Sequence, residues 1–224
     1  YFVLSSIPAA FRNALNGKFP EAPGLAVECI TELGQLGLAI GGEAMKSGRH
    51  ALGALGVVAA VRLFHPGGGL KGAFEWTEQR TGFLIPVDPF LDLLERPTEN
   101  SADDEPESDR RRGDLIAMAV TMPVQGLSKL RLEVLGVECK FTNGVLDAPY
   151  ALGALGQSRR SMERLVALCS AAQADDGIPE RLALLQLVRF GLRISGGHDE
   201  SNQARRLQQE SVIYEHVLRG EFEF

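Results

Sequence analysis

Hydrophobic and polar residues follow a helical pattern in the first part of the chain. Between positions 22 and 64, apolar residues recur every three or four positions, which predicts two helices, or one helix broken near Gly41 and Gly42. The sequence HPGGG at 65–69 ends this region, because proline and glycine both interrupt helices. The motif ALGALG occurs at 51–56 and again at 151–156, and its small residues favour close packing of two helices on the sheet.

The middle of the chain carries short apolar runs that are typical of strands. The run at 82–87 predicts a strand, in which Pro86 argues against a central position in a sheet. A brief helical turn is expected at 90–94. The runs at 114–121 and 129–142 predict two further strands, and the turn between them indicates a hairpin.

Beyond these strands the helical pattern returns, over 150–172, 180–192 and 202–218. The segment 96–112 is polar and acidic and has too little apolar surface to order itself, which predicts a mobile acidic loop inside the domain. Helix, strands and helices in this order predict an α+β (α/β/α-like) fold, a small mixed sheet with a central β-hairpin flanked by helices. We divide the chain into an N-terminal segment at 1–21, a main domain at 22–195 and a C-terminal helix at 196–224.

Composition and charge narrow the class of protein. The chain has 224 residues, 45% of them hydrophobic, which is enough for a sizeable core. Its 23 Lys and Arg against 29 Asp and Glu give a net charge of −6, which disfavours a wholly basic nucleic-acid coat. Apolar runs stay shorter than the roughly 18 residues of a membrane span, so no membrane partner is expected.

The cysteines and the first residue bear on cellular context. The three cysteines, Cys29, Cys139 and Cys169, have no paired spacing, which indicates unlinked thiols in a reducing compartment and hence a cytoplasmic location. The chain starts at Tyr1 rather than at methionine, and we expect it to be part of a longer protein.

Two opposite charges lie near the end of the strand predicted at 129–142. Because side chains alternate along a strand, Glu138 and Lys140 project from one face and Cys139 from the other. Burying such charges is costly without a partner such as a metal ion, which makes the pair a candidate site. Asp114, at the start of the preceding strand, supplies a second carboxylate at the same end of the predicted hairpin.

Asp114 opening one strand, the E-x-K of Glu138 and Lys140 on the next, and the helix that follows resemble the PD-(D/E)xK nuclease superfamily. This superfamily includes restriction-enzyme, Mrr-like and RecB-like domains, and the resemblance implies a restriction-endonuclease-like fold over residues 33–168. It also implies that Asp114 and Glu138 bind Mg²⁺, or Mn²⁺, together with the backbone carbonyl of Cys139, while Lys140 assists the attacking water.

Two further residues match the superfamily more loosely. Glu43 stands where many members carry an acidic residue on the helix before the first strand, although a Glu beside two glycines also suits the start of a helix. Gln157 falls where some members carry a glutamine on the helix after the E-x-K.

Basic residues near this motif are candidates for binding nucleic acid. Arg160 and Arg164 follow Gln157 at separations of three and four residues, so all three share one face of a helix and are placed to hold phosphates. Arg112 ends an arginine triplet just before Asp114 and adds local positive potential. The alternative is a solvated helix face and a triplet neutralised by the acidic run before it.

These residues predict a metal-dependent DNA endonuclease domain that hydrolyses phosphodiester bonds in phage defence, restriction or repair. The chain is also similar to nuclease modules attached to FtsK/HerA-type ATPases. This similarity implies further domains or subunits of a larger protein, one of which would be an ATPase. The sequence leaves open whether the chain forms a homo-oligomer. The alternative is a catalytically inactive nuclease-like domain acting as an assembly or DNA-docking module. A third hypothesis, a purely helical interaction domain, requires that the predicted strands do not form.

Overall fold

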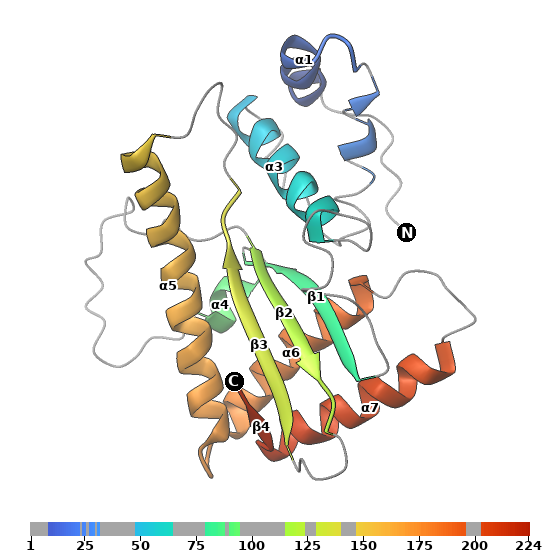
Figure 1. The fold of residues 1–224 in the computed structure, drawn as a ribbon, viewed down its shortest axis with the longest axis vertical. Coiled ribbons are helices and arrows are strands. Elements are labelled where there is room, and N and C mark those ends of the chain that lie inside the picture. Colours follow the sequence, from blue (N-terminus) through green and yellow to red (C-terminus); the bar gives the residue numbers. More distant parts are fainter. Residues whose placement is uncertain are drawn as a thin grey trace.

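The computed structural model describes residues 9–22, 24–25, 27–29, 31, 48–64, 79–87, 90–94, 115–123, 129–139, 147–195 and 203–224. Figure 1 shows how its helices and strands are arranged. In chain order they are α1 (Ala9–Lys18), α3 (Gly48–Phe64), β1 (Arg80–Pro86), α4 (Leu91–Leu94), β2 (Leu115–Thr121), β3 (Leu130–Val137), α5 (Ala148–Gln173), α6 (Ile178–Ser195), α7 (Gln203–Arg219) and β4 (Phe222–Glu223).

In the described part of the chain, four strands form one mixed sheet in the order β1-β2-β3-β4. β2 pairs antiparallel with both β1 and β3, so the predicted hairpin of β2 and β3 lies at the centre of the sheet. β4 joins β3 in parallel through the pairs Leu130–Phe222 and Arg131–Glu223. The predicted α+β class with a small mixed sheet is confirmed, and β1, which ends at Pro86, is an edge strand.

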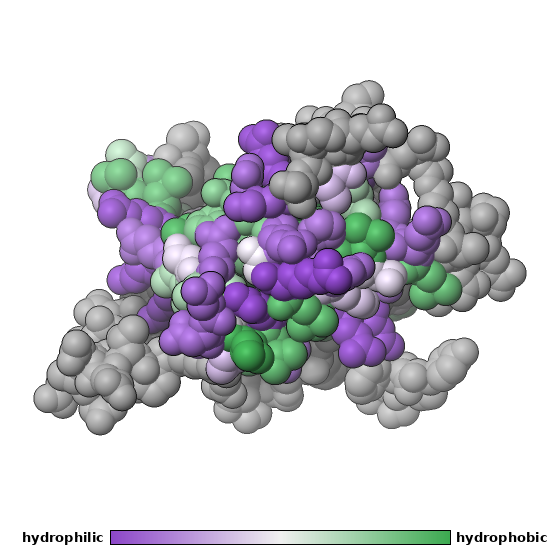
Figure 2. Space-filling view, turned by 90° about the horizontal axis from the view of Figure 1, so that it is seen from below, coloured by the Kyte–Doolittle hydropathy of each residue, from purple (hydrophilic) through white to green (hydrophobic). Residues whose placement is uncertain are grey.

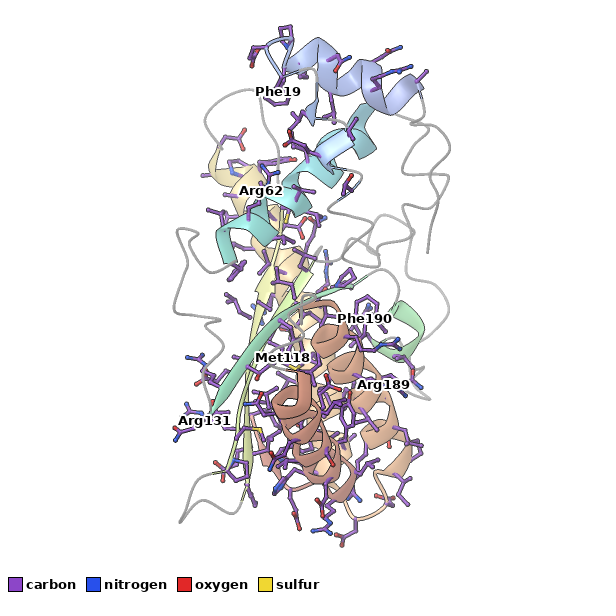
Figure 3. The ribbon with its side chains drawn as sticks, turned by 90° about the vertical axis from the view of Figure 1, so that its right-hand side faces the viewer. Phe19, Arg62, Met118, Arg131, Arg189 and Phe190 are labelled. Atoms are coloured by element: carbon purple, nitrogen blue, oxygen red, sulfur yellow. The ribbon has the colours of Figure 1, made fainter. Side chains whose placement is uncertain are left out.

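Helices α5, α6 and α7 cover one face of the sheet, which we call the inner face (Figures 1 and 3). Alternate strand residues such as Phe83 and Met118 share a single core with Leu187 of α6 and Ile213 of α7. Figure 3 shows Met118 between the sheet and these helices. A Cβ atom on Gly191 of α6 would overlap the ring of Phe83, so α6 approaches β1 very closely. The main core therefore lies between the inner face and the three helices.

The opposite face, which we call the outer face, is divided into an apolar and a polar half. Where β2 begins, Phe64 of α3 packs against Leu84 and Ala117, with Val137 beside them. α3 in turn contacts α1. At the other end of the strands, Arg131 points away from the helices (Figure 3). Side chains alternate between the two faces along each strand, and those on the outer face form an apolar half that α3 covers. In the described part of the chain, no helix covers the other, polar half of this face.

A tight turn after α7 directs the last residues into the sheet. Gly220 has a φ of 71°, a left-handed conformation that glycine adopts without strain, and its N–H donates to the carbonyl of Val217. Phe222 then pairs with β3 and is fully buried in the core. The Gln173 side chain donates to the carbonyl of Phe222. The C-terminal helix, separated in our division of the sequence, is thereby joined to the main core.

Several elements differ from the expectations. The strand predicted at 129–142 ends at Val137, because its ladder with β2 ends at the pair Leu115–Val137, and Glu138 follows the strand instead of lying within it. α1 and β4 were not anticipated. The purely helical hypothesis is wrong, because the strands form. The proposed helix break at Gly41–Gly42 and the acidic loop at 96–112 lie outside the described residues.

Both copies of the ALGALG motif lie in helices, but they pack differently. In α3, a Cβ atom on Gly56 would lie 3.1 Å from the Cβ of Cys139, so this glycine permits a close approach. In α5, a Cβ on Gly153 or Gly156 would have no heavy atom of another described residue within 4 Å, apart from its chain neighbours and the backbone of its own helix, and the neighbouring Leu152 is 68% exposed. The expectation of close packing therefore holds for the first copy and is wrong for the second.

Hydrophilic residues cover most of the described surface when the molecule is seen from below, and hydrophobic residues form small separate groups there (Figure 2). Among the described helices, none combines the length and the apolar character needed to cross a membrane.

Candidate functional site

The candidate site begins where the β2–β3 ladder ends. Leu115, the first residue of β2, pairs with Val137, the last residue of β3. Glu138 directly follows that pair on one strand, and Asp114, which directly precedes it on the other, lies outside the described residues. The described register thus brings the chain neighbours of both predicted carboxylates to one end of the sheet.

Two helices approach the chain closely at this end. A Cβ atom on Gly136 would lie 2.8 Å from Cγ of Met162 and would overlap the Ser158 hydroxyl, so α5 is packed tightly on β3 two residues before Glu138. Cys139, one residue after Glu138, is in contact with Gly56 of α3. Both carboxylate oxygens of Glu138 are buried. A buried carboxylate is stable only beside positive charge or hydrogen-bond donors, so its environment is a chemically specialised one.

Helix α5 carries the other described candidates. Asp147 is the N-cap of α5 and has an extended backbone. Its side-chain oxygen accepts a hydrogen bond of 2.8 Å from the Tyr150 N–H, which caps the first turn. The buried stripe of α5 includes Ser161 and Leu168. Gln157 lies one helical turn before Ser161, and Arg164 lies one turn before Leu168. Gln157, Arg160 and Arg164 are therefore half-buried at the border of the stripe, rather than solvated.

Two polar atoms of this border have no hydrogen-bond partner among the described residues. These atoms are Oε1 of Gln157 and Nε of Arg160, and both are buried. The two residues are three positions apart, so their side chains leave α5 from neighbouring positions on one side. Buried polar atoms of this kind normally bind a protein group, water or a ligand, so the Gln157–Arg160 border is suited to binding a polar molecule.

The structure therefore describes one part of the predicted site. Glu138, Cys139, Gln157, Arg160 and Arg164 are described, and they come from the end of β3 and from α5. The other predicted residues, Glu43, Arg112, Asp114 and Lys140, lie outside the described residues. Within the described part, no three His, Cys, Asp or Glu side chains gather as a metal-binding group.

Sequence reasoning missed Gly136, which lets α5 approach this end of the sheet, whereas Gly56 of α3 belongs to the first ALGALG motif, for which close packing was expected. Gly136 belongs to no motif, and only the structure reveals that a Cβ there would meet α5. A glycine inside a predicted strand does indicate a close approach of another element, which is the one signal the sequence offered for Gly136.

Comparison with other proteins adds no further assignment. No protein-family model, curated protein or solved structure matches the chain. The described residues at this end of the sheet are therefore the basis on which a function is proposed.

Proposed function

We propose that the chain is a metal-dependent DNA endonuclease domain that hydrolyses phosphodiester bonds. The observation that carries the proposal is the register of the central hairpin, in which Leu115 pairs with Val137. The proposal extends this register by one pair, to Asp114 and Glu138, which would then offer two carboxylates at one end of the sheet. Side chains of directly opposed residues lie on the same face of a sheet, as a shared metal ion requires.

The described donor atoms fit a hard cation such as Mg²⁺ or Mn²⁺. Both oxygens of Glu138 are buried, and on the adjacent helix α5 the buried Gln157 oxygen has no hydrogen-bond partner among the described residues. Carboxylate and carbonyl oxygens are the ligands that Mg²⁺ prefers, and the cation keeps several waters. In the proposed site, Asp114, Glu138 and the Cys139 carbonyl would hold the cation. When bound, it lowers the pKa of a coordinated water and offsets negative charge on the phosphate.

The chain's own side chains would supply the rest of the chemistry. Lys140 would orient the attacking water, and Glu43 would add negative charge on the helical side of the site. Arg160, Arg164 and Arg112 would bind the phosphates on either side of the scissile bond. A preorganised cation stabilises charge where it develops in the transition state, so these residues would act on rate as well as on binding.

Cleavage of supercoiled plasmid DNA in Mg²⁺ tests the proposal. Asp114→Asn, Glu138→Gln and Lys140→Ala are each expected to lower the cleavage rate roughly 100-fold or more, because each removes a group that acts on the reacting atoms. The matched control is Glu163→Gln, which removes an exposed carboxylate of α5 that is ion-paired with Arg159 at 2.7 Å. Circular dichroism establishes that each variant is folded, and EDTA is expected to abolish cleavage.

Two results would contradict the proposal. Full cleavage by Glu138→Gln would assign any activity to other residues. An unaltered chain that binds DNA but does not cleave it in Mg²⁺ or Mn²⁺ would instead indicate an inactive DNA-docking module. If cleavage is found, phage defence, restriction or repair is the proposed setting, with an ATPase as the partner that delivers DNA.

A further inference from the structure

One long face of α5 is not covered by any other described element. α5 packs on β3, α4 and α6, and its buried residues, such as Leu165, form a stripe along one side of the helix. Figure 1 shows α5 at one side of the molecule. The residues opposite the buried stripe recur every three or four positions from Leu152 to Ser170, and they are exposed or half-buried. We call this row of residues the α5 face.

The α5 face exposes several apolar side chains to solvent. Leu152 and Leu155 are the two most exposed large hydrophobic residues in the described part of the chain, at 68% and 65%, and Val166 on the same face is also exposed. A single exposed leucine is ordinary in a folded protein. Several of them in a row on one helix are instead typical of a surface that packs against another protein.

The charges at the centre of the α5 face complement a second copy of the same face. Arg159 and Glu163 form an exposed ion pair of 2.7 Å along the helix, and the level of Ser161 lies midway between them. If two α5 helices pack antiparallel about a two-fold axis at that level, Arg159 of each copy faces Glu163 of the other. Moving the axis to position 159 or 163 would place like charges opposite each other, so the charges favour one register.

The side-chain sizes on the α5 face are complementary in the same register. Every remaining pair of facing positions joins a larger side chain to a smaller one. The facing pairs are Leu152 with Ser170, Leu155 with Ala167, and Val166 with Gly156. Around a Cβ on Gly156, only its chain neighbours and its own helix backbone come within 4 Å among the described residues, which leaves space for a valine of the second copy. Large side chains opposite small ones let two helices interdigitate at the usual 8–10 Å between axes.

We propose that the α5 face binds the α5 face of a second copy of this chain, antiparallel and about a two-fold axis. Charge and size agree on one register, and the same surface serves both copies, as a two-fold dimer requires. The paired segment from Leu152 to Ser170 is about 27 Å long at the rise of a helix. One helix pair of this length is a small interface, so we expect a weak dimer with a dissociation constant of about 10 μM. The proposal is independent of the proposed nuclease function.

Sedimentation velocity of the unaltered chain over roughly 1–200 μM tests for the dimer. Leu155→Glu is expected to weaken association about tenfold or more, because it places a carboxylate against the second copy. The matched control is Leu207→Glu, which makes the same change at an exposed leucine of α7 and is expected to leave association as it is. Circular dichroism establishes that both variants are folded. Monomers of the unaltered chain at every concentration would overturn the proposal and leave the α5 face to a different protein, and equal effects of the two variants would also overturn it.

Two charge reversals test the antiparallel register. Arg159→Glu and Glu163→Arg each place like charges opposite each other in a dimer of identical copies, so each variant alone is expected to associate about tenfold more weakly. In an equal mixture, opposite charges face each other again at both positions, and association is expected to return. Glu163→Gln keeps an acceptor and adds no repulsion, so it is expected to change the affinity less than about threefold. A mixture that stays monomeric, when the unaltered chain forms dimers, would overturn the proposed pairing.

Discussion

Single residues decide how closely the helices approach the sheet. Gly191 lets α6 contact the ring of Phe83, and Gly136 lets α5 contact β3 beside the candidate site. Other glycines of the same helices have open space around them, as at Gly153. The role of a glycine in this protein therefore follows from what its missing Cβ would meet, which helical propensity alone does not reveal.

Gly191→Ala is expected to destabilise the protein by about 1–3 kcal/mol, because the added methyl group overpacks a core that holds the rigid Phe83 ring. Gly153→Ala is the matched control, since it makes the same change in a helix at a position where, among the described residues, only the local helix backbone and the chain neighbours come within 4 Å of the new methyl group. It is expected to stabilise the protein by about 0.5–1 kcal/mol through higher helix propensity. Urea unfolding measures both, and equal midpoints for the two variants would contradict the close approach of α6 to β1.

At the level of individual side chains, the sequence predicted part of the candidate site. The spacing of Gln157, Arg160 and Arg164 placed them on one side of a helix, and α5 spans all three. Their half-burial could not be predicted, because it depends on how α5 sits against β3. The relation of Glu138 to Asp114 and Lys140 stays a prediction, because two of the three residues lie outside the described ones.

At the scale of elements, those with a clear apolar pattern were predictable, and those without one were not. The continuous apolar run of β2 and the 3.6-residue pattern of α5 fixed those elements to within a few residues. β4 has two residues and no periodicity, so its pairing with β3 depends on the turn at Gly220. The end of β3 at Val137 depends on where its partner strand begins, which the sequence of β3 itself does not contain.

The start of α5 depends on its capping residue. Asp147→Ala is expected to lower the free energy of unfolding by about 1 kcal/mol, because the Tyr150 N–H loses its acceptor. Asp147 is exposed, so the substitution leaves the core unchanged. Asp147→Asn keeps an acceptor at the same position and serves as the control. Identical urea midpoints for the alanine and asparagine variants would show that this cap does not stabilise the helix.

At the scale of the whole molecule, one buried thiol links stability to pH. Burial raises the pKa of Cys169 from 9.0 to about 12. Below pH 9 the thiol is protonated in both the folded and the unfolded chain and has no effect. Between pH 9 and 12 the unfolded chain loses this proton while the folded chain keeps it, so stability falls as pH rises, by about 1.4 kcal/mol per pH unit.

Cys169→Ala is therefore expected to flatten the decline of unfolding free energy above pH 9, even though it loses some packing at neutral pH. Cys139→Ala, which changes a half-buried cysteine next to the candidate site, should leave that decline as it is. Urea unfolding at several pH values from 8 to 10.5 compares the slopes. The same slope in both variants would mean that Cys169 does not titrate with folding.

The edges of the sheet have a consequence for the behaviour of the protein in concentrated solution. β1 begins with the charged Arg80 and ends with Pro86, which has no N–H to offer another strand. At the other side, β4 is only two residues long, and α5 runs beside β3 (Figure 1). Free, regular strand edges are the usual templates for aggregation. The same features that bound this small sheet therefore hinder the stacking of one molecule onto the next.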